Sequence, residues 1–440
     1  MKKVLSTVAV LGLVAGLATS AAALELKVKG DYTVDGFYID DSNGAPALPG
    51  TEAGGGGVAL TGTKAKSDAW LQHMFNIEAE MVVNDKISMM SRVRLIDWGT
   101  VWGSQDDTNV NNGRNMSIER LWMVYKSDIG LWDVGRRPGA AFGLSFIDSV
   151  GNFDRIMWRS GKLFGDTFSA HAYFQKNTEA EAYIATTDDQ DTDYYEVAGA
   201  AKGGWGSATL AYGLTLNNSG DIPGTTEAGF ETNQHRIKGV GQFKIGSNMG
   251  LDTEFDYNWG EKDYNQTGKT DQDISKFAFI ADFWATVDAL TGHAMYFHTS
   301  GDDDNAITTD IEDYGGTGAD FEPLYILTGA FGRILNSDQG GSDAQTAGVH
   351  AVVVSADYAA TQDLSLRAAI GYAQADKEKT SWDDEYGFEY NVGAAYRLQD
   401  NLIYAVHLGY LDTGDFFKKG IAATELNNIM LASHHLTMSF

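Results

Sequence analysis

Residues 385–398 alternate between two kinds of side chain, and this alternation constrains the fold more than any other feature of the chain. A period of two residues is the signature of a β-strand, whose successive side chains point to opposite faces. One face is apolar and rich in aromatic rings, with Tyr386, Phe388, Tyr390, Val392, Ala394, Tyr396 and Leu398. The other face is small or polar, with Glu385, Gly387, Glu389, Asn391, Gly393, Ala395 and Arg397. An apolar face paired with a polar one is typical of strands in a transmembrane β-barrel.

The last ten residues, 431–440, repeat this pattern. Leu436, Met438 and Phe440 share one face, and Ser433, Thr437 and Ser439 share the other. A barrel in lipid must pair its last strand with its first, because an open edge would leave backbone groups without hydrogen bonds. We therefore expect the segment that ends at Phe440 to close the barrel.

Composition excludes several classes of protein. After the N-terminus there is no run of about 20 apolar residues, so helical membrane spans are excluded. The absence of Cys excludes a disulfide scaffold and a thiolate metal site. The net charge of −28 argues against nucleic-acid binding. The Gly-rich segments lack the strand-to-helix context of a phosphate-binding loop, and we expect neither a cofactor nor a bound metal.

The first 23 residues predict a signal peptide. Lys2 and Lys3 form a basic start, Val4 to Leu17 an apolar segment, and Ala21 to Ala23 a small-residue cleavage site. The alternative is a membrane anchor, for which the apolar segment is short. Export together with a barrel predicts the cell outer membrane as the location and its lipid and lipopolysaccharide as the surroundings.

Residues 24–440 predict a single all-β domain, an antiparallel transmembrane barrel of about eighteen strands. Sixteen strands remain an alternative, because the segments 153–159 and 291–299 are weak. Short connections alternate with long ones such as 99–115, 138–152, 178–191 and 300–345. We expect the short ones to be periplasmic turns and the long ones extracellular loops.

Arginines are concentrated between residues 92 and 159, and alternation predicts which of them face the lumen. Arg92, Arg94, Arg155 and Arg159 alternate with apolar residues and should point inward. A charge on the lipid face near the middle of the bilayer costs roughly 2–4 kcal/mol, which supports this orientation. Strict alternation also sends Arg137 inward.

These arginines predict a basic patch on one wall of the lumen. Between residues 118 and 126 the pattern is ambiguous, since either Glu119 or Arg120 could face inward. Acids that could oppose the patch are Asp148 and Asp154. Such a constriction would select solutes by charge. The alternative is that the arginines merely pair with Glu119 or Asp97.

Residues 118–137 resemble the strand, glycine turn and strand of general porins from Gram-negative outer membranes. That resemblance implies that Arg136, which follows Gly135, is the constriction arginine, so Arg136 and Arg137 both remain candidates. It also implies that loop 138–152 narrows the pore. Of the family motif Pro-Glu-Phe-Gly-Gly this loop keeps only Phe142-Gly143 and lacks the glutamate. The terminal Phe440 matches the family's signal for the barrel-assembly machinery, and membership would imply a homotrimer.

The resulting expectation is a porin through which small hydrophilic solutes and ions diffuse passively. The alternative is a substrate-specific channel for an anionic sugar or carboxylate. No serine or acid stands beside a histidine in a pattern that nominates a catalytic set, so an enzyme is not expected. Residues 107–113 resemble a calcium loop but lack its closing glutamate. The acidic runs at 188–191 and 302–304 could hold divalent ions that bridge lipopolysaccharide.

Overall fold

The computed structural model describes residues 25–42, 66–102, 116–139, 142–147, 151–179, 190–219, 229–265, 269–302, 310–318, 320–329, 335, 347–378, 380–420 and 426–440. Several predicted features lie outside these residues. They are the signal peptide 1–23, the calcium-loop candidate 107–113, Asp148, and Asp188, Asp189, Asp303 and Asp304 of the acidic runs. Among the described residues, no helix is long and apolar enough to cross a bilayer.

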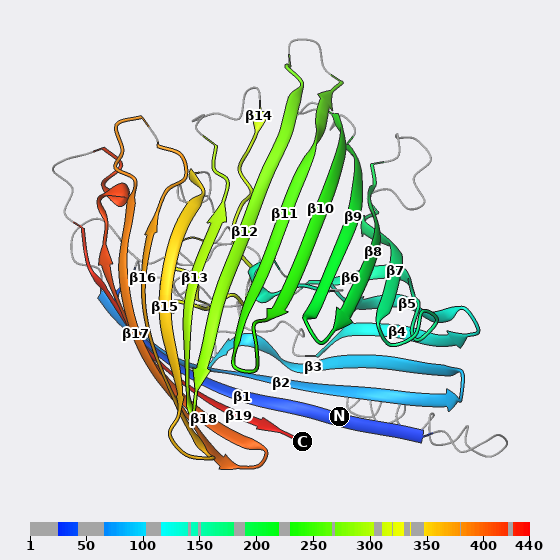
Figure 1. Cartoon of the computed structure of the whole chain (residues 1–440), viewed down its shortest axis with the longest axis horizontal. Helices are drawn as coiled ribbons and strands as arrows, with labels where there is room; N and C mark the ends of the chain where they lie inside the picture. Colours follow the sequence, from blue (N-terminus) through cyan, green and yellow to red (C-terminus); the bar gives the residue numbers. More distant parts are fainter. Residues whose placement is uncertain are drawn as a thin grey trace.

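Eighteen strands form a closed antiparallel barrel, in which each strand pairs with its neighbours in the chain (Figure 1). They are β1 (Glu25–Ser42), β2 (Lys66–Asn84), β3 (Ile87–Val101), β4 (Ser117–Ser127), β5 (Gly130–Pro138), β6 (Asn152–Arg159), β7 (Phe168–Thr178), β8 (Thr192–Gly203), β9 (Gly206–Ser219), β10 (Phe230–Lys244), β11 (Met249–Tyr264), β12 (Gln272–Val287), β13 (Leu290–Thr299), β15 (Val349–Ala359), β16 (Leu364–Gln374), β17 (Glu385–Gln399), β18 (Leu402–Thr413) and β19 (Ile429–Ser439). The short strand β14 (Asp310–Ile311) pairs in parallel with β12 and is not part of the ring. The weak segments 153–159 and 291–299 form β6 and β13. The prediction of eighteen strands is therefore confirmed, and the alternative of sixteen is not.

The ring closes between the first and last strands. Asp31 pairs with Ser439 and Ile39 with Leu431, and β1 and β19 lie side by side in Figure 1. The backbone N–H of Phe440 donates to the Gly30 carbonyl at 3.0 Å, and that of Gly30 donates to the Phe440 carbonyl at 2.9 Å. The prediction that this segment closes the barrel is confirmed.

Alternation along the strands separates an apolar outer surface from a polar lumen. On β17, Phe388, Tyr390 and Val392 are exposed on the outside, while Glu389 and Asn391 are buried inside. The same separation holds on the neighbouring strands, whose exposed apolar residues include Val352, Val354, Ile370, Leu408 and Tyr410. Large apolar side chains remain exposed only where a nonpolar partner covers them, which suits a lipid-facing wall.

Tyr386 is an exception to the predicted alternation on β17. It was expected on the outer face, but it is fully buried and its hydroxyl donates to the Gly348 carbonyl at 2.8 Å. The register with β16 shifts at this point, where Gln374 pairs with Glu385 and Ala373 with Gly387. This bulge leaves Tyr386 unpaired and turns its side chain inward, as an extra residue in one strand does.

Two long connections fold into the lumen and give the barrel an apolar core on one side. The first is the connection between β5 and β6, which carries the short helix η1 (Ser145–Ile147). The second joins β14 to β15 and contributes Phe321, Leu324, Ile326 and Leu327, all buried. The rings of Phe146 and Phe321 lie 5.1 Å apart, and Phe297 of β13 packs against both. The connection 300–345 was expected to be an extracellular loop, and the inward position of its residues 320–329 was not foreseen.

Candidate functional site

Six of the predicted arginines face the lumen from four consecutive strands, and we call them the arginine cluster. They are Arg92 and Arg94 on β3, Arg120 on β4, Arg137 on β5, and Arg155 and Arg159 on β6. Their apolar neighbours, such as Leu121, Val134 and Ile156, are exposed on the outer face. The inward orientation inferred from alternation is therefore what the structure shows.

A β-bulge resolves the ambiguity between Glu119 and Arg120. Arg92 pairs directly with Arg120, whereas Val93 pairs with Ile118, so Glu119 is the extra residue between them. A bulge allows two successive side chains to share one face. Both Glu119 and Arg120 therefore face inward.

Glu119 organises the first half of the cluster. Its carboxylate lies 3.2 Å from Nε of Arg92 and forms an ion pair with Arg94. Nε of Arg120 donates instead to the side-chain oxygen of Asn152 at 2.6 Å. Asn152 in turn reaches Glu119 at 3.5 Å, so one hydrogen-bonded network links β3, β4 and β6.

Asp133 organises the second half. It is only 1% exposed, and it forms ion pairs with Arg137 and with Arg159, the latter at 2.8 Å. Two guanidinium groups therefore share one carboxylate. Because a single negative charge cannot neutralise both, this part of the lumen wall keeps a net positive charge.

Arg155 forms no ion pair among the described residues, although the buried Glu196 lines the same cavity. Its Nε donates to the Gln175 side chain, and Nη1 lies 3.4 Å from the Pro138 carbonyl. Its guanidinium also lies 4.3 Å from the centre of the Tyr173 ring, in a cation–π contact. Neutral partners hold this arginine in place without cancelling its charge.

Arg136 does not join the cluster. It pairs in register with the outward-facing Leu121, its side chain is 53% exposed, and it lies 3.4 Å from Asp154, which is 59% exposed. The structure thus places Arg136 and Asp154 on the outer face. The resemblance to the general porins, which selected Arg136 for the constriction, is wrong at this position. Alternation, which favoured Arg137, gives the observed orientation because β5 continues without a bulge to Pro138.

Loop 138–152 reaches from the arginine cluster to the wall formed by β10 and β11. The Phe142 carbonyl accepts a hydrogen bond from Nζ of Lys238 at 3.3 Å, and Lys238 pairs with Glu254 at 2.9 Å. Gly143 has φ +144, and a Cβ there would lie 2.8 Å from both Glu254 Oε1 and Lys238 Nζ. The Phe-Gly pair of the sequence is therefore the point where this loop touches the facing wall.

A cavity of about 280 Å³ lies between this loop and strands β6 to β11. It is lined by three cationic side chains, Arg155, Arg236 and Lys238, by the acidic Glu196, and by Tyr173 and Tyr194. Arg236 donates to the fully buried Asp256 at 2.7 Å, and the Tyr314 hydroxyl donates to the same carboxylate at 2.8 Å. Sequence analysis did not single out Arg236 or Lys238, although both occupy alternate positions of one strand.

The second inward loop is held by Glu389, whose carboxylate accepts three backbone N–H groups. The donors are Tyr325 at 2.6 Å, Ile326 at 3.0 Å and Leu327 at 2.7 Å. Burial raises the pKa of Tyr325 to about 12, so its phenol stays neutral at physiological pH. The signal that could have revealed this loop is the apolar run 324–327 within an otherwise polar connection.

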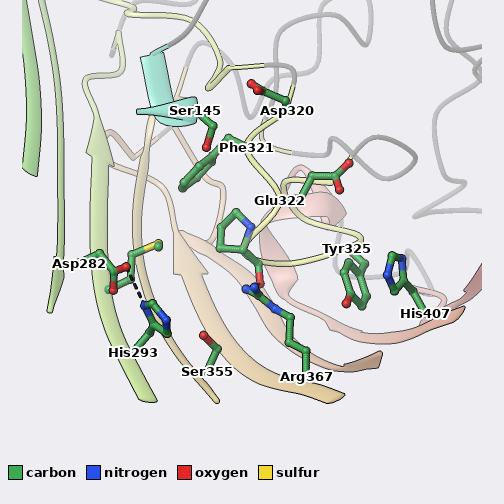
Figure 2. Close-up of a pocket in the computed structure, with 12 residues that line it drawn as sticks. Ser145, Asp282, His293, Asp320, Phe321, Glu322, Tyr325, Ser355, Arg367 and His407 are labelled. Carbon is green, nitrogen blue, oxygen red and sulfur yellow. Dashed lines mark hydrogen bonds and ion pairs between the residues drawn. The ribbon is translucent and has the colours of Figure 1, made fainter. Parts of the chain in front are cut away.

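A second cavity, of about 440 Å³, lies beneath this loop (Figure 2). Acidic residues of the loop, Asp320 and Glu322, lie above it, and Arg367 rises from the barrel wall toward the Pro323 carbonyl at 3.4 Å. Nδ1 of His293 lies 2.8 Å from Asp282. This cavity has charges of both signs facing each other.

The same cavity contains a serine, a histidine and an aspartate, but their geometry does not match a hydrolytic triad. Nε2 of His293 lies 3.8 Å from Asp357, and among the described residues no hydrogen bond joins it to Ser355. A nucleophile needs its base within hydrogen-bond reach. These side chains are therefore not joined as a hydrolytic triad in this structure.

Comparisons with known proteins found similar structures only. No family model matches, and no curated protein does. The solved structures of two Pseudomonas aeruginosa proteins are similar. OccK3 (OpdO) has a TM-score of 0.53 and 13% identity, covering 94% of this chain and 96% of its own. The outer membrane protein opdK has a TM-score of 0.50 and 11% identity, covering 94% and 98%.

A BenF-like porin from Pseudomonas fluorescens Pf-5 is similar to the same degree. Its TM-score is 0.51 at 11% identity, covering 94% of this chain and 99% of its own. Such low identity shows the fold alone. The chain thus shares its closed antiparallel β-barrel with a porin and with an outer membrane protein.

Proposed function

We propose that this protein is an outer-membrane channel through which small hydrophilic solutes and ions diffuse passively. The observation that carries the proposal is the arginine cluster on the inner wall of a closed barrel, into which residues 142–147 project. A barrel with an apolar outer surface suits lipid, and a charged inner wall suits water-filled passage. The shared fold with a porin supports this function.

The cluster would favour anions at the narrow part of the lumen. Six arginines share three engaged carboxylates, Glu78, Glu119 and Asp133, and Arg155 forms no ion pair among the described residues. Fixed positive charge in a narrow, partly desolvated passage attracts anions and repels cations. We therefore propose weak anion selectivity.

A substrate-specific channel for an anionic sugar or carboxylate is the second candidate. The observation that favours it is the 280 Å³ cavity, in which three cations, Arg155, Arg236 and Lys238, outnumber the single lining acid Glu196 and lie with the rings of Tyr173 and Tyr194. Cations would bind the acid group and rings would cover the sugar face. A sugar acid such as gluconate would then block the current in a saturable way, whereas a general diffusion channel would show no such block.

The decisive experiment is the reversal potential of purified protein in a planar bilayer under a KCl gradient. We expect stepwise conductance with anion preference in the wild type. Replacing Arg92 and Arg94 together by alanine should shift the preference toward cations, because Glu119 then loses both partners. Arg136→Ala is the matched control, since it removes an arginine charge from the outer face.

Two results would overturn the proposal. Absence of conductance would indicate a barrel that does not conduct. An identical reversal potential in the wild type and in the Arg92→Ala, Arg94→Ala variant would show that the cluster does not select ions.

The remaining expectations about the surroundings are also proposals. They are export through cleavage of residues 1–23, a homotrimer, contact with lipopolysaccharide, and recognition of Phe440 by the barrel-assembly machinery. The exposed Phe440 ring, 6.2 Å from the Phe75 ring on the outer surface, is in a position where such machinery could contact it.

A further inference from the structure

A cluster of two histidines and an aspartate lies outside the lumen, and the proposed channel function does not use it. His298 stands near the end of β13, His350 near the start of β15, and Asp376 just after β16. One ligand atom from each residue can be chosen so that all three lie within 4.8 Å of one another. His298 and His350 are paired in register and face outward beside the exposed Tyr296.

We propose that His298, His350 and Asp376 form a binding site for a divalent transition metal ion of the Zn²⁺ type. Two imidazoles and a carboxylate are the ligand types that bind zinc in sites with an open coordination position. Ligand atoms around a tetrahedral zinc lie roughly 3.4 Å apart, from Zn–N distances of about 2.0–2.1 Å. Oδ1 of Asp376 lies 2.9 Å from Nε2 of His350, which is near that spacing.

The surrounding hydrogen bonds favour ligand behaviour at all three residues. Nδ1 of His350 lies 2.7 Å from the Tyr296 hydroxyl, so the tautomer that donates there leaves a lone pair on Nε2. Nδ1 of His298 donates to the Val349 carbonyl at 3.1 Å, so this ring would offer Nε2 to a metal ion. Such partners fix the tautomer and orientation of metal-binding histidines.

Asp376 is held in the same manner. Its Oδ2 accepts a hydrogen bond from the Gly301 N–H at 2.9 Å, which leaves Oδ1 directed at the imidazoles. The two imidazole rings stack with centres 4.4 Å apart at an interplanar angle of 19°, so one ring would have to rotate for both nitrogens to direct their lone pairs at one ion. The three side chains are partly buried, and His350 is the most accessible of them.

The three residues lie where the connection between β13 and β15 leaves and re-enters the barrel wall. Gly301 and Val349 lie at the two ends of the connection that sends residues 320–329 into the lumen. The backbone N–H groups of Asp376 and Lys377 both donate to the Ala347 carbonyl, at 3.0 and 2.9 Å. A bound ion would therefore tie together both ends of this connection and the end of β16.

The test is a calorimetric titration of the purified, metal-stripped full chain in detergent with Zn²⁺. We expect one site per chain in the wild type, and an affinity weakened by about tenfold or more in His350→Ala and in Asp376→Asn. Zn²⁺ should also raise the temperature of unfolding of the wild type but not of these variants. Asp376→Asn preserves the shape of the side chain, and so separates loss of binding from loss of folding.

His235→Ala is the matched control. His235 also faces outward and bonds to a tyrosine hydroxyl, that of Tyr212 at 2.7 Å, but it forms no ion pair among the described residues. The control should bind Zn²⁺ like the wild type. Equal binding by the wild type and by His350→Ala, or an equal loss in His235→Ala, would overturn the proposal, as would a wild type that does not bind Zn²⁺.

Discussion

Asp133 is the residue on which the charge balance of the arginine cluster depends. It is almost fully buried and is shared by Arg137 and Arg159. Removing one partner of a buried ion pair typically costs about 3–5 kcal/mol, because the remaining charge is left without compensation. We therefore expect Asp133→Asn to lower the free energy of unfolding and to increase anion preference in the lumen.

Denaturant unfolding and reversal potentials would measure the two effects of Asp133→Asn. The control is Asp154→Asn, which breaks the exposed pair with Arg136 on the outer face. Exposed pairs contribute about 0–1 kcal/mol, so the control should change stability little and selectivity not at all. If Asp133→Asn left selectivity unchanged, the charge at this position would not act on permeating ions.

At this scale, alternation alone predicted most inward arginines, because side chains on a regular strand have only two directions. It failed where a bulge adds one residue. The bulge at Glu119 turned both acid and arginine inward, and the bulge at Tyr386 buried that residue's own ring. A sequence does not show which residue a bulge will leave unpaired, since that depends on the register with the neighbouring strand. The resemblance to the general porins misplaced Arg136 because a matching motif does not show how the strand is paired with its neighbour. In this chain Arg136 pairs with the outward-facing Leu121.

Among the elements, η1 depends on a single aromatic anchor. Phe146 is buried against Phe297 and Phe321, with ring centres 5.8 and 5.1 Å away. Truncating a buried phenylalanine costs about 3–5 kcal/mol, here mainly in docking the loop. We expect Phe146→Ala to increase single-channel conductance and its fluctuations, because loop 138–152 would leave the wall more often.

Single-channel recording would test the Phe146 prediction. Phe164→Ala, in the short turn between β6 and β7, removes an exposed ring instead and should leave conductance unchanged. A Phe146→Ala channel with wild-type conductance would mean that the loop does not limit the passage.

The second inward loop makes a parallel prediction through Glu389. Its carboxylate accepts the N–H groups of Tyr325, Ile326 and Leu327. In Glu389→Gln the side-chain NH₂ group would face at least one of these backbone N–H groups, so that hydrogen bond would be lost. A hydrogen bond to a charged acceptor is also stronger than one to a neutral acceptor, which adds to the cost. We expect the loop to become susceptible to proteolysis while the barrel stays folded.

Limited proteolysis followed by mass spectrometry would locate the new cleavage sites. Glu231→Gln, at an exposed position of β10, is the control and should remain resistant. Cleavage that is equal in the two variants would show that Glu389 does not hold the loop.

The strands themselves were predictable because each carries its own two-residue period, including the weak β6 and β13. The inward course of residues 320–329 was not predictable, because a loop has no period and its direction follows from contacts made far away in sequence. Glu389 contacts residues more than 60 positions earlier. The apolar run Leu324-Tyr325-Ile326-Leu327 was the one local sign.

For the whole molecule, we expect two opposing charge distributions to determine ion selectivity. The chain carries a net charge of −28, and acidic runs such as 188–191 and 302–304 fall in its long connections. The arginine cluster is positive and lies inside the barrel. Acids at the mouth would concentrate cations there, while the cluster would favour anions at the waist.

Salt separates these two contributions, since screening shortens the reach of exposed charges. The Debye length is about 10 Å at 0.1 M and about 3 Å at 1 M, and partly buried charges are screened much less. We expect the anion-to-cation permeability ratio to rise between 0.1 and 1 M KCl, because the field of the mouth fades first. The variant with Arg92 and Arg94 replaced by alanine should show a smaller rise. The prediction fails if anions and cations are equally permeant at 1 M KCl and the variant does not change this. In that case the arginines are neutralised by their partners and only support the wall.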